Sequence, residues 1–133
     1  MHYGFVRIAT AIPSIKVGDC KHNALQIENL IVQAEGKGVE IICFPELSIT
    51  SSTCGDLFSQ DLLLESAEMA LITILDFTRS LSIVSVVGLP LVCNDMVIDA
   101  AAVIQKGKSL GIVPKCHVPN GRESNGKRWF SSA

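Results

Sequence analysis

Apolar residues recur at steps of three and four along two stretches of the chain, which is the spacing of one face of an α-helix. The first stretch runs from about 20 to 36, and Asp19 before it is a residue type that caps helix N-termini. Its apolar positions are Ala24, Ile27, Leu30, Ile31 and Ala34. The second stretch runs from Asp56, another candidate cap, to about 80, with apolar positions Leu57, Leu63, Leu64, Ala67, Leu71, Ile74 and Leu75. The pattern predicts two amphipathic helices.

Other segments are short and apolar, as β-strands are. They lie at 4–13, 39–44, 82–92, 97–107 and 109–114, and turn-forming residues separate the last three. Strands that alternate with helices and then pair as hairpins predict an α/β fold with one mostly parallel sheet and two helices. The remainder, 116–133, is rich in Gly, Asn and Ser and is expected to be loop.

The composition is apolar for so short a chain. The 133 residues suit one domain and are too few for two. Hydrophobic residues make up 48% and charged residues 18%, although a small domain has much surface to cover. Either the chain buries a face against a copy of itself or a partner, or it forms part of a larger fold.

Charge and motifs argue against several classes of protein. The net charge of −2 comes with no basic stripe, so nucleic-acid binding is not expected. No apolar stretch reaches the roughly 20 residues that span a bilayer, so no membrane contact is expected. The N-terminus does not resemble a signal peptide. The five scattered cysteines form no CxxC pair, which argues against zinc and favours reduced thiols in the cytoplasm.

Two charged residues stand where predicted strands end. Glu46 follows the apolar run 41–44, and Lys115 follows the last predicted strand. In open α/β sheets functional groups gather just beyond the carboxyl ends of strands, so this carboxylate and this amine are expected to share a cleft. The spacing alone favours a structural ion pair, or two unrelated surface charges, over a catalytic pair.

Several short motifs occur in an order that resembles one enzyme family. They are FPELSIT (44–50), TCGDLF (53–58), VVGLPL (86–91), AAVIQKGKSLGIVPK (101–115) and KRWF (127–130). The chain resembles the amino-terminal half of a carbon–nitrogen hydrolase (nitrilase) domain, and more closely the glutaminase domain of glutamine-dependent NAD synthetases. The resemblance covers 1–133 as one unit, with no complete second domain.

The resemblance implies a Glu-Lys-Cys triad, with Glu46 as the general base and Lys115 as the lysine. A thiol is mostly protonated at neutral pH, so a carboxylate must take its proton before the sulfur can attack an amide carbon. A fixed ammonium would then stabilise the oxyanion that forms. No metal or cofactor is implied for this portion, whereas the family's separate synthetase domain uses ATP and Mg²⁺.

The nucleophile of the triad should lie some dozens of residues beyond Lys115, past the last residue of this chain. None of the five cysteines is expected to replace it. Cys43 is expected to be buried within a strand, and Cys116 should point away from Lys115 because neighbours on an extended segment face opposite ways. Cys54 falls in a family motif in which it is not the nucleophile.

The substrate pocket implied by the resemblance is also altered. Small or polar residues stand at positions where the family has a Gly-Tyr pair, aromatic residues and a second glutamate: Ser51, Ser52, Gly121, Ser124, Asn125 and Gly126. Such replacements remove packing area and hydrogen-bond partners. Glu123 could supply a carboxylate from a shifted position.

The family fold is an α-β-β-α sandwich, of which this chain would supply one sheet and two helices. The second sheet is then missing or supplied by a partner chain. At about 25 cal/mol per Å² of apolar area, a bare sheet face would forfeit on the order of 10 kcal/mol. The isolated chain is therefore expected to self-associate, or its strands and helices are expected to shift and cover that face.

Three hypotheses about function remain at this point. The chain is part of a glutaminase that supplies ammonia for NAD synthesis, inactive alone, and binds glutamine or another small amide once its cleft is completed. Alternatively, it is a diverged, non-catalytic oligomerisation or interaction module. A small flavodoxin-like binding domain is disfavoured, because no Gly-rich phosphate loop follows the first strand.

Overall fold

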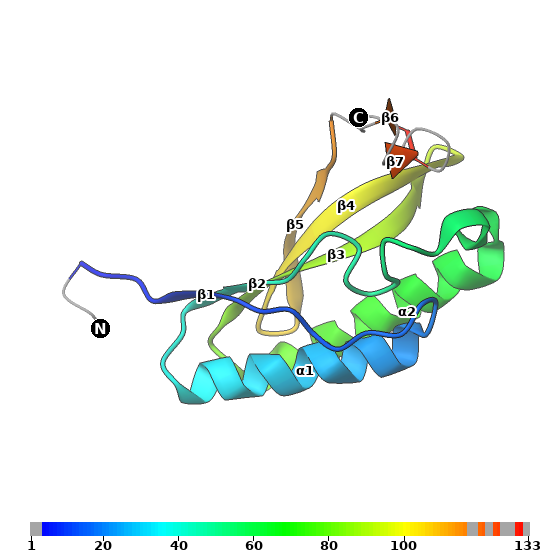
Figure 1. The fold of residues 1–133 in the computed structure, drawn as a ribbon. Helices are drawn as coiled ribbons and strands as arrows, with labels where there is room; N and C mark the ends of the chain where they lie inside the picture. Colours follow the sequence, from blue (N-terminus) through cyan, green and yellow to red (C-terminus); the bar gives the residue numbers. More distant parts are fainter. Residues whose placement is uncertain (1–3, 117–119, 122–123, 126–129, 132–133) are drawn as a thin grey trace.

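The computed structural model describes residues 4–116, 120–121, 124–125 and 130–131. A five-stranded sheet carries two helices on one of its faces (Figure 1). The elements are β1 (Ile8–Thr10), α1 (Cys20–Gly36), β2 (Ile41–Cys43), η1 (Gly55–Ser59), α2 (Asp61–Phe77), η2 (Thr78–Ser80), β3 (Val84–Cys93), β4 (Met96–Gln105) and β5 (Lys108–Pro114). The predicted α/β class is confirmed. Two short strands, β6 (Asn120–Gly121) and β7 (Ser124–Asn125), pair in the region predicted to be loop.

The sheet is mixed, with strand order β1-β2-β3-β4-β5. The first three strands run parallel and are joined through α1 and α2, whereas β4 and β5 return as hairpins. The turn between β3 and β4 uses Asn94 and Asp95, whose φ angles of 51° and 62° suit these residue types. Lys106 and Gly107 turn the chain in the same way before β5.

The two helices begin differently. Asp19 caps α1, because its Oδ1 accepts a hydrogen bond from the backbone N–H of His22 at 3.0 Å, as predicted. The prediction that Asp56 caps the second helix is wrong. Asp56 lies in η1, and the extended backbone of Gln60 interrupts the helical path before α2 begins at Asp61. The apolar spacing alone did not indicate this break.

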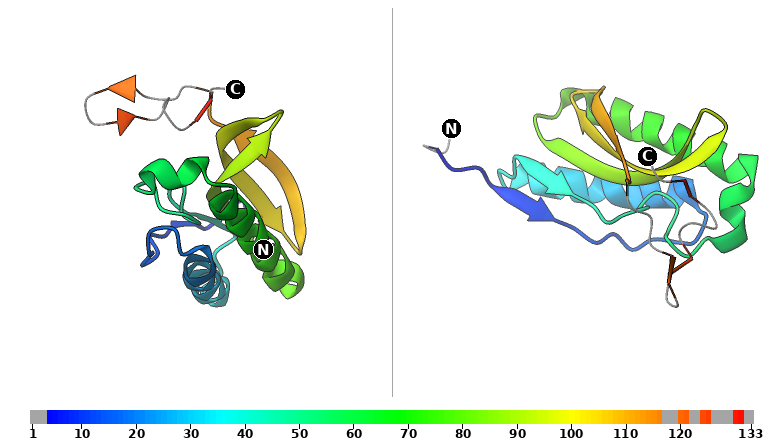
Figure 2. Two further views of the ribbon diagram at one scale, coloured as in Figure 1. Left: turned by 90° about the vertical axis from the view of Figure 1, so that its right-hand side faces the viewer. Right: turned by 90° about the horizontal axis from the view of Figure 1, so that it is seen from above.

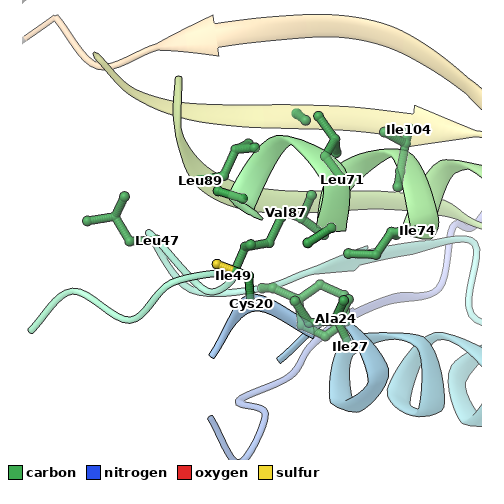
Figure 3. Close-up of a cluster of buried hydrophobic side chains, with 14 of the residues drawn as sticks. Cys20, Ala24, Ile27, Leu47, Ile49, Leu71, Ile74, Val87, Leu89 and Ile104 are labelled. Atoms are coloured by element: carbon green, nitrogen blue, oxygen red, sulfur yellow. The ribbon is translucent and has the colours of Figure 1, made fainter. Parts of the chain in front are cut away.

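The core lies between the helices and one face of the sheet (Figure 3). Ile27 from α1 and Ile74 from α2 are fully buried against Val87, Leu89 and Ile104 of the sheet. Figure 2 shows both helices on the same side of the strands. The apolar stripes predicted from the sequence are therefore the faces that build this core.

No helix among the described residues covers the opposite sheet face (Figure 2). Cross-strand partners on it are Ile41 with Val84, Val86 with Val103, and Ala101 with Val113. Val113 is 58% exposed, and the other members of these pairs are half-buried. This apolar surface is called the open face below.

Candidate active site

The loop that carries Glu46 leaves β2 in a tight turn. Phe44 N–H still donates to Val86 O at 2.9 Å, so the chain stays paired with β3 until the turn begins. Ser48 N–H then donates back to Pro45 O at 3.2 Å, and Leu47 takes a φ of 55°. This turn leaves Glu46 exposed while Leu47 is buried in the core.

The turn fits closely against Gly88 of β3. A Cβ on Gly88 would lie 2.5 Å from Leu47 N and 2.9 Å from Pro45 O. The Ser48 hydroxyl accepts from Gly88 N–H at 3.3 Å, and Ile49 N–H donates to Gly88 O at 3.1 Å. Only glycine leaves room for this approach, so Gly88 fixes where Glu46 stands.

Asn23 of α1 anchors the other side of the loop. Its fully buried side chain donates to Ile49 O at 2.9 Å and to Lys16 O at 2.8 Å, and it accepts from Lys16 N–H at 2.7 Å. All these polar groups are thereby satisfied in the core. Asn23 was not predicted from the sequence, because a single polar residue in an amphipathic helix gives no signal of this kind.

Lys115 reaches Glu46 from the end of β5. Its N–H donates to Asp99 O at 2.8 Å, which continues the pairing of β4 with β5 by one residue. Its Nζ lies 2.5 Å from Glu46 Oε1. The structure therefore brings together the two charges that the sequence placed at strand ends, 69 positions apart.

Asp99 is the charged neighbour that the sequence reading missed. It lies inside β4, opposite Pro90 of β3, and its side chain is 7% exposed. Its Oδ2 is 3.9 Å from Lys115 Nζ, so the same ammonium lies beside both Asp99 and Glu46. A carboxylic acid is costly to bury without partners. An aspartate within an apolar strand is therefore the sequence signal that could have identified Asp99 as part of a site.

The pKa values of Glu46 and Asp99 are shifted in opposite directions. The hydrogen bond from Asp99, together with the Lys115 ammonium, holds the pKa of Glu46 below its ordinary value, although partial burial opposes this. Burial raises the pKa of Asp99 to about 7, and its hydrogen bond to Glu46 and the charge of Glu46 add to the rise. Neutral pH therefore leaves Glu46 ionised and Asp99 near its midpoint.

Glu46, Asp99 and Lys115 line a hollow of about 340 Å³ on the open face. Its walls are lined by the Glu46 loop, β3 and β4 residues, and Val113 to Lys115. Cys43 also lines it and is half-buried, so the expectation of a buried Cys43 is wrong. In β2 it alternates with buried Ile42 and thus faces the open side. A larger hollow of about 660 Å³ lies between α1 and α2, away from Glu46 and Lys115.

Two of the other cysteines, Cys20 and Cys54, are poorly suited to act as a thiolate. Cys20 and Cys54 are buried, and burial raises the pKa of Cys20 to about 11 and that of Cys54 as well, which keeps both as thiols. Cys116 is exposed, with its Sγ 3.9 Å from Pro114 O. The described residues contain no group of three or more potential metal ligands, and none of their helices is long and apolar enough to cross a membrane.

Some predicted pocket positions cannot be compared with the structure. Glu123 and Gly126 lie outside the described residues, as do the first three residues of KRWF. Phe130, the last residue of that motif, is buried, and its ring centroid lies 4.8 Å from that of Phe58. Phe130 is thus packed against the TCGDLF motif.

Comparison with known proteins agrees with this arrangement. Residues 7–132 match the carbon-nitrogen hydrolase family, which accounts for nearly the whole chain. The chain belongs to the carbon-nitrogen hydrolase family. Family membership confirms the resemblance, although the catalytic roles of Glu46 and Lys115 remain predictions.

The similar sequences within this family are glutamine-dependent NAD(+) synthetases. That of Mycobacterium leprae is 34% identical over 128 residues, which are 96% of this chain and 19% of the relative. That of Aquifex aeolicus is 36% identical over 114 residues, 86% of this chain and 20% of the relative. The chain therefore resembles one portion of these proteins and spans about a fifth of their length.

Solved structures show the same fold. The glutamine-dependent NAD(+) synthetase of Cytophaga hutchinsonii superposes with a TM-score of 0.89 at 28% identity, over 96% of this chain and 22% of that one. An amidase from Nesterenkonia sp. superposes with a TM-score of 0.78 at 20% identity, over 96% of this chain and 48% of that one. The chain thus corresponds to about half of the amidase fold, as the sequence motifs indicated.

Proposed function

We propose that Glu46 and Lys115 are the base and the ammonium of a site that hydrolyses an amide C–N bond, of the kind found in the side chain of glutamine. The observation that carries the proposal is the 2.5 Å contact between Lys115 Nζ and Glu46 Oε1 at the mouth of the open-face hollow. A carboxylate kept ionised beside an ammonium suits both parts of that chemistry.

The reaction needs a thiol as its third member. Glu46 takes the thiol proton, the sulfur attacks the amide carbon, and Lys115 stabilises the oxyanion. The C–N bond breaks as ammonia leaves with the proton that Glu46 returns. Water then attacks the thioester, giving its proton to Glu46, which passes it to the departing sulfur. Side chains alone suffice for these steps.

The thiol is proposed to come from a part of the protein outside these 133 residues or from a partner chain. The relatives are about five times longer than the matched region, and the amidase from Nesterenkonia sp. AN1 has an active-site cysteine to which acrylamide adds. ATP and Mg²⁺ would serve a separate synthetase part. A cytoplasmic location belongs to the same proposal, because the cytoplasm keeps scattered thiols reduced.

Ammonia release from glutamine tests the proposal. The 133-residue chain should release no ammonia above the buffer background. A longer form of the protein that includes a reactive cysteine, translated from any coding sequence that follows Ala133, should release ammonia. In the active protein Glu46→Gln and Lys115→Met should each lower kcat about 100-fold or more. The matched controls Glu68→Gln and Lys108→Met change exposed residues outside the hollow.

Two results would contradict the proposal. Release that survives Glu46→Gln would remove Glu46 from the chemistry. Release by the 133-residue chain, abolished by Cys43→Ser, would mean that the thiol is already within the hollow rather than supplied from elsewhere.

The open face favours a second candidate function, that of an association module. Its cross-strand apolar pairs lie on the side of the sheet that no helix of the described part of the chain covers, and Val113 among them is 58% exposed. Apolar surface of this kind is stabilised when it is covered, at about 25 cal/mol per Å². We propose a second copy of the chain as the cover when no other sheet is supplied.

A further inference from the structure

Asp99 is a buried acid at the base of the Glu46–Lys115 pair. It projects from the middle of β4 on the same side as Ala101, toward the open-face hollow. Its side chain is 7% exposed, against 51% for Glu46 and 31% for Lys115. Asp99 therefore lies beneath the other two groups and has little contact with water.

Lys115 Nζ lies 2.5 Å from Glu46 Oε1 and 3.9 Å from Asp99 Oδ2, so the two acids meet at one ammonium, and a hydrogen bond between their carboxyl groups requires a proton. Two carboxylates cannot hydrogen-bond to each other, because each then has only acceptor oxygens. One of the two acids must be neutral whenever this bond exists. The question is which carboxyl group holds the proton.

Burial and the position of Lys115 both place the proton on Asp99. Charge is costlier on the more buried carboxyl, which is Asp99. Lys115 Nζ lies 2.5 Å from Glu46 Oε1 and 3.9 Å from Asp99 Oδ2, so its positive charge favours the ionised form of Glu46 more strongly. The opposite pKa shifts of Glu46 and Asp99 agree with this assignment.

We propose that Asp99 is a positioning residue for the Glu46 base: it holds the proton that the two carboxyl groups share and donates it in a hydrogen bond to the Glu46 carboxylate. Lys115 balances the charge of that carboxylate from the other side. The importance of this arrangement for catalysis rests on the proposed function, whereas the arrangement itself does not.

The consequence is that protonation of Asp99 sets both the orientation and the basicity of Glu46. With the proton present, Glu46 is held between an O–H donor and an ammonium, and its basicity is reduced. When Asp99 loses the proton, the hydrogen bond is replaced by repulsion between like charges, and Lys115 is shared between two carboxylates. Glu46 is then a stronger base but is less well oriented.

No other charged group in the described lining of this hollow competes for that role. The groups that face Asp99 are Glu46 from the loop after β2 and Lys115 from the end of β5. The neighbouring β3 residue is Pro90, which offers no N–H. Cys43 is the one further titratable side chain in that part of the lining.

Carboxyl carbon NMR of the 133-residue chain tests the proposal without any need for activity. Asp99 Cγ should titrate near pH 7, about three pH units above an ordinary aspartate. Glu46 Cδ should titrate below its ordinary range and show a second, smaller inflection as Asp99 ionises, as coupled acids do. Titration of Asp99 at the ordinary value would overturn the proposal.

Two nearly isosteric variants separate positioning from packing. Asp99→Asn keeps an N–H donor for Glu46 but cannot ionise, so the Glu46 curve should lose its second inflection and stay low. Asp99→Leu removes the donor, so the Glu46 midpoint should rise relative to Asp99→Asn. Equal Glu46 curves in wild type and Asp99→Asn would contradict the proposal even if Asp99→Leu fails to fold.

The same variants distinguish this inference from the proposed function. In an active, longer form of the protein, Asp99→Asn should remove the inflection near neutral pH from the profile of kcat. The expected titrations without amide hydrolysis would refute the proposed function and leave the role of Asp99 standing. Amide hydrolysis that depends on Glu46, together with an ordinary Asp99 titration, would support the proposed function and refute the role of Asp99.

Discussion

Replacing Gly88 by alanine tests how the sheet fixes the position of Glu46. The new Cβ would lie 2.5 Å from Leu47 N and 2.9 Å from Pro45 O, both backbone atoms of the Glu46 loop. Real Cβ contacts stay above 3.0 Å, so the loop must retreat by about 0.5 Å or more. That movement weakens the 3.1 Å hydrogen bond from Ile49 N–H to Gly88 O. Overpacking and the weakened bond should together lower the free energy of unfolding by about 2–4 kcal/mol.

Gly111 in β5 supplies the matched control, because a Cβ there meets nothing within 4 Å. Gly111→Ala should change the free energy of unfolding by less than about 1 kcal/mol. Urea titrations followed by circular dichroism measure both variants, and amide NMR shifts of Glu46 and Lys115 should move in Gly88→Ala alone. Equal midpoints for the two variants would refute the close fit of the loop against β3.

Three further predictions follow from the caps, the open face and the buried acid. Asp19→Ala removes the cap of α1 and should lower the free energy of unfolding, measured by thermal unfolding, by about 1 kcal/mol. Gln60→Ala loses no capping hydrogen bond and should change it by less than about 0.5 kcal/mol. A larger loss for Gln60→Ala than for Asp19→Ala would contradict the assigned caps. Val113→Lys charges the open face and should shift sedimentation toward monomer, whereas Leu62→Lys on the helix layer should not; equal effects would exclude the open face as the interface. The folded state binds the Asp99 proton more tightly than the unfolded state, so its contribution to stability should be lost as pH rises from about 4 to about 7. Asp99→Asn should flatten that dependence in urea titrations, and an unchanged slope would count against the raised pKa.

The helices and the strand-end charges could be predicted because local patterns determine them. Three- and four-residue spacing identifies the buried face of α1, and Asp19 is a capping residue type in the right place. Glu46 and Lys115 follow apolar segments, and the rule for carboxyl ends of strands places them at one edge of the sheet. The family motifs then reinforced an arrangement that the spacing alone left open.

The rest depended on contacts between segments that are distant in sequence. Asp99 becomes part of the site only because the register of β4 with β5 sets it beside Lys115. Cys43 looked buried because β2 is apolar at every position, and sequence does not reveal which sheet face the helices cover. Gln60 ended the apparent helix through an extended backbone that its residue type does not demand.

A zero-length carbodiimide reaction tests most directly whether Glu46 and Lys115 meet. The reagent joins an amine to a carboxyl group only where the two are in contact, and mixing ¹⁵N-labelled with unlabelled chains separates links within one chain from links between copies. Peptide mass spectrometry should find Lys115 joined to Glu46 within one chain, and Glu46→Gln should abolish that product. Lys115 joined only to carboxyl groups outside the hollow, or left unjoined while other lysines react, would contradict the site described above.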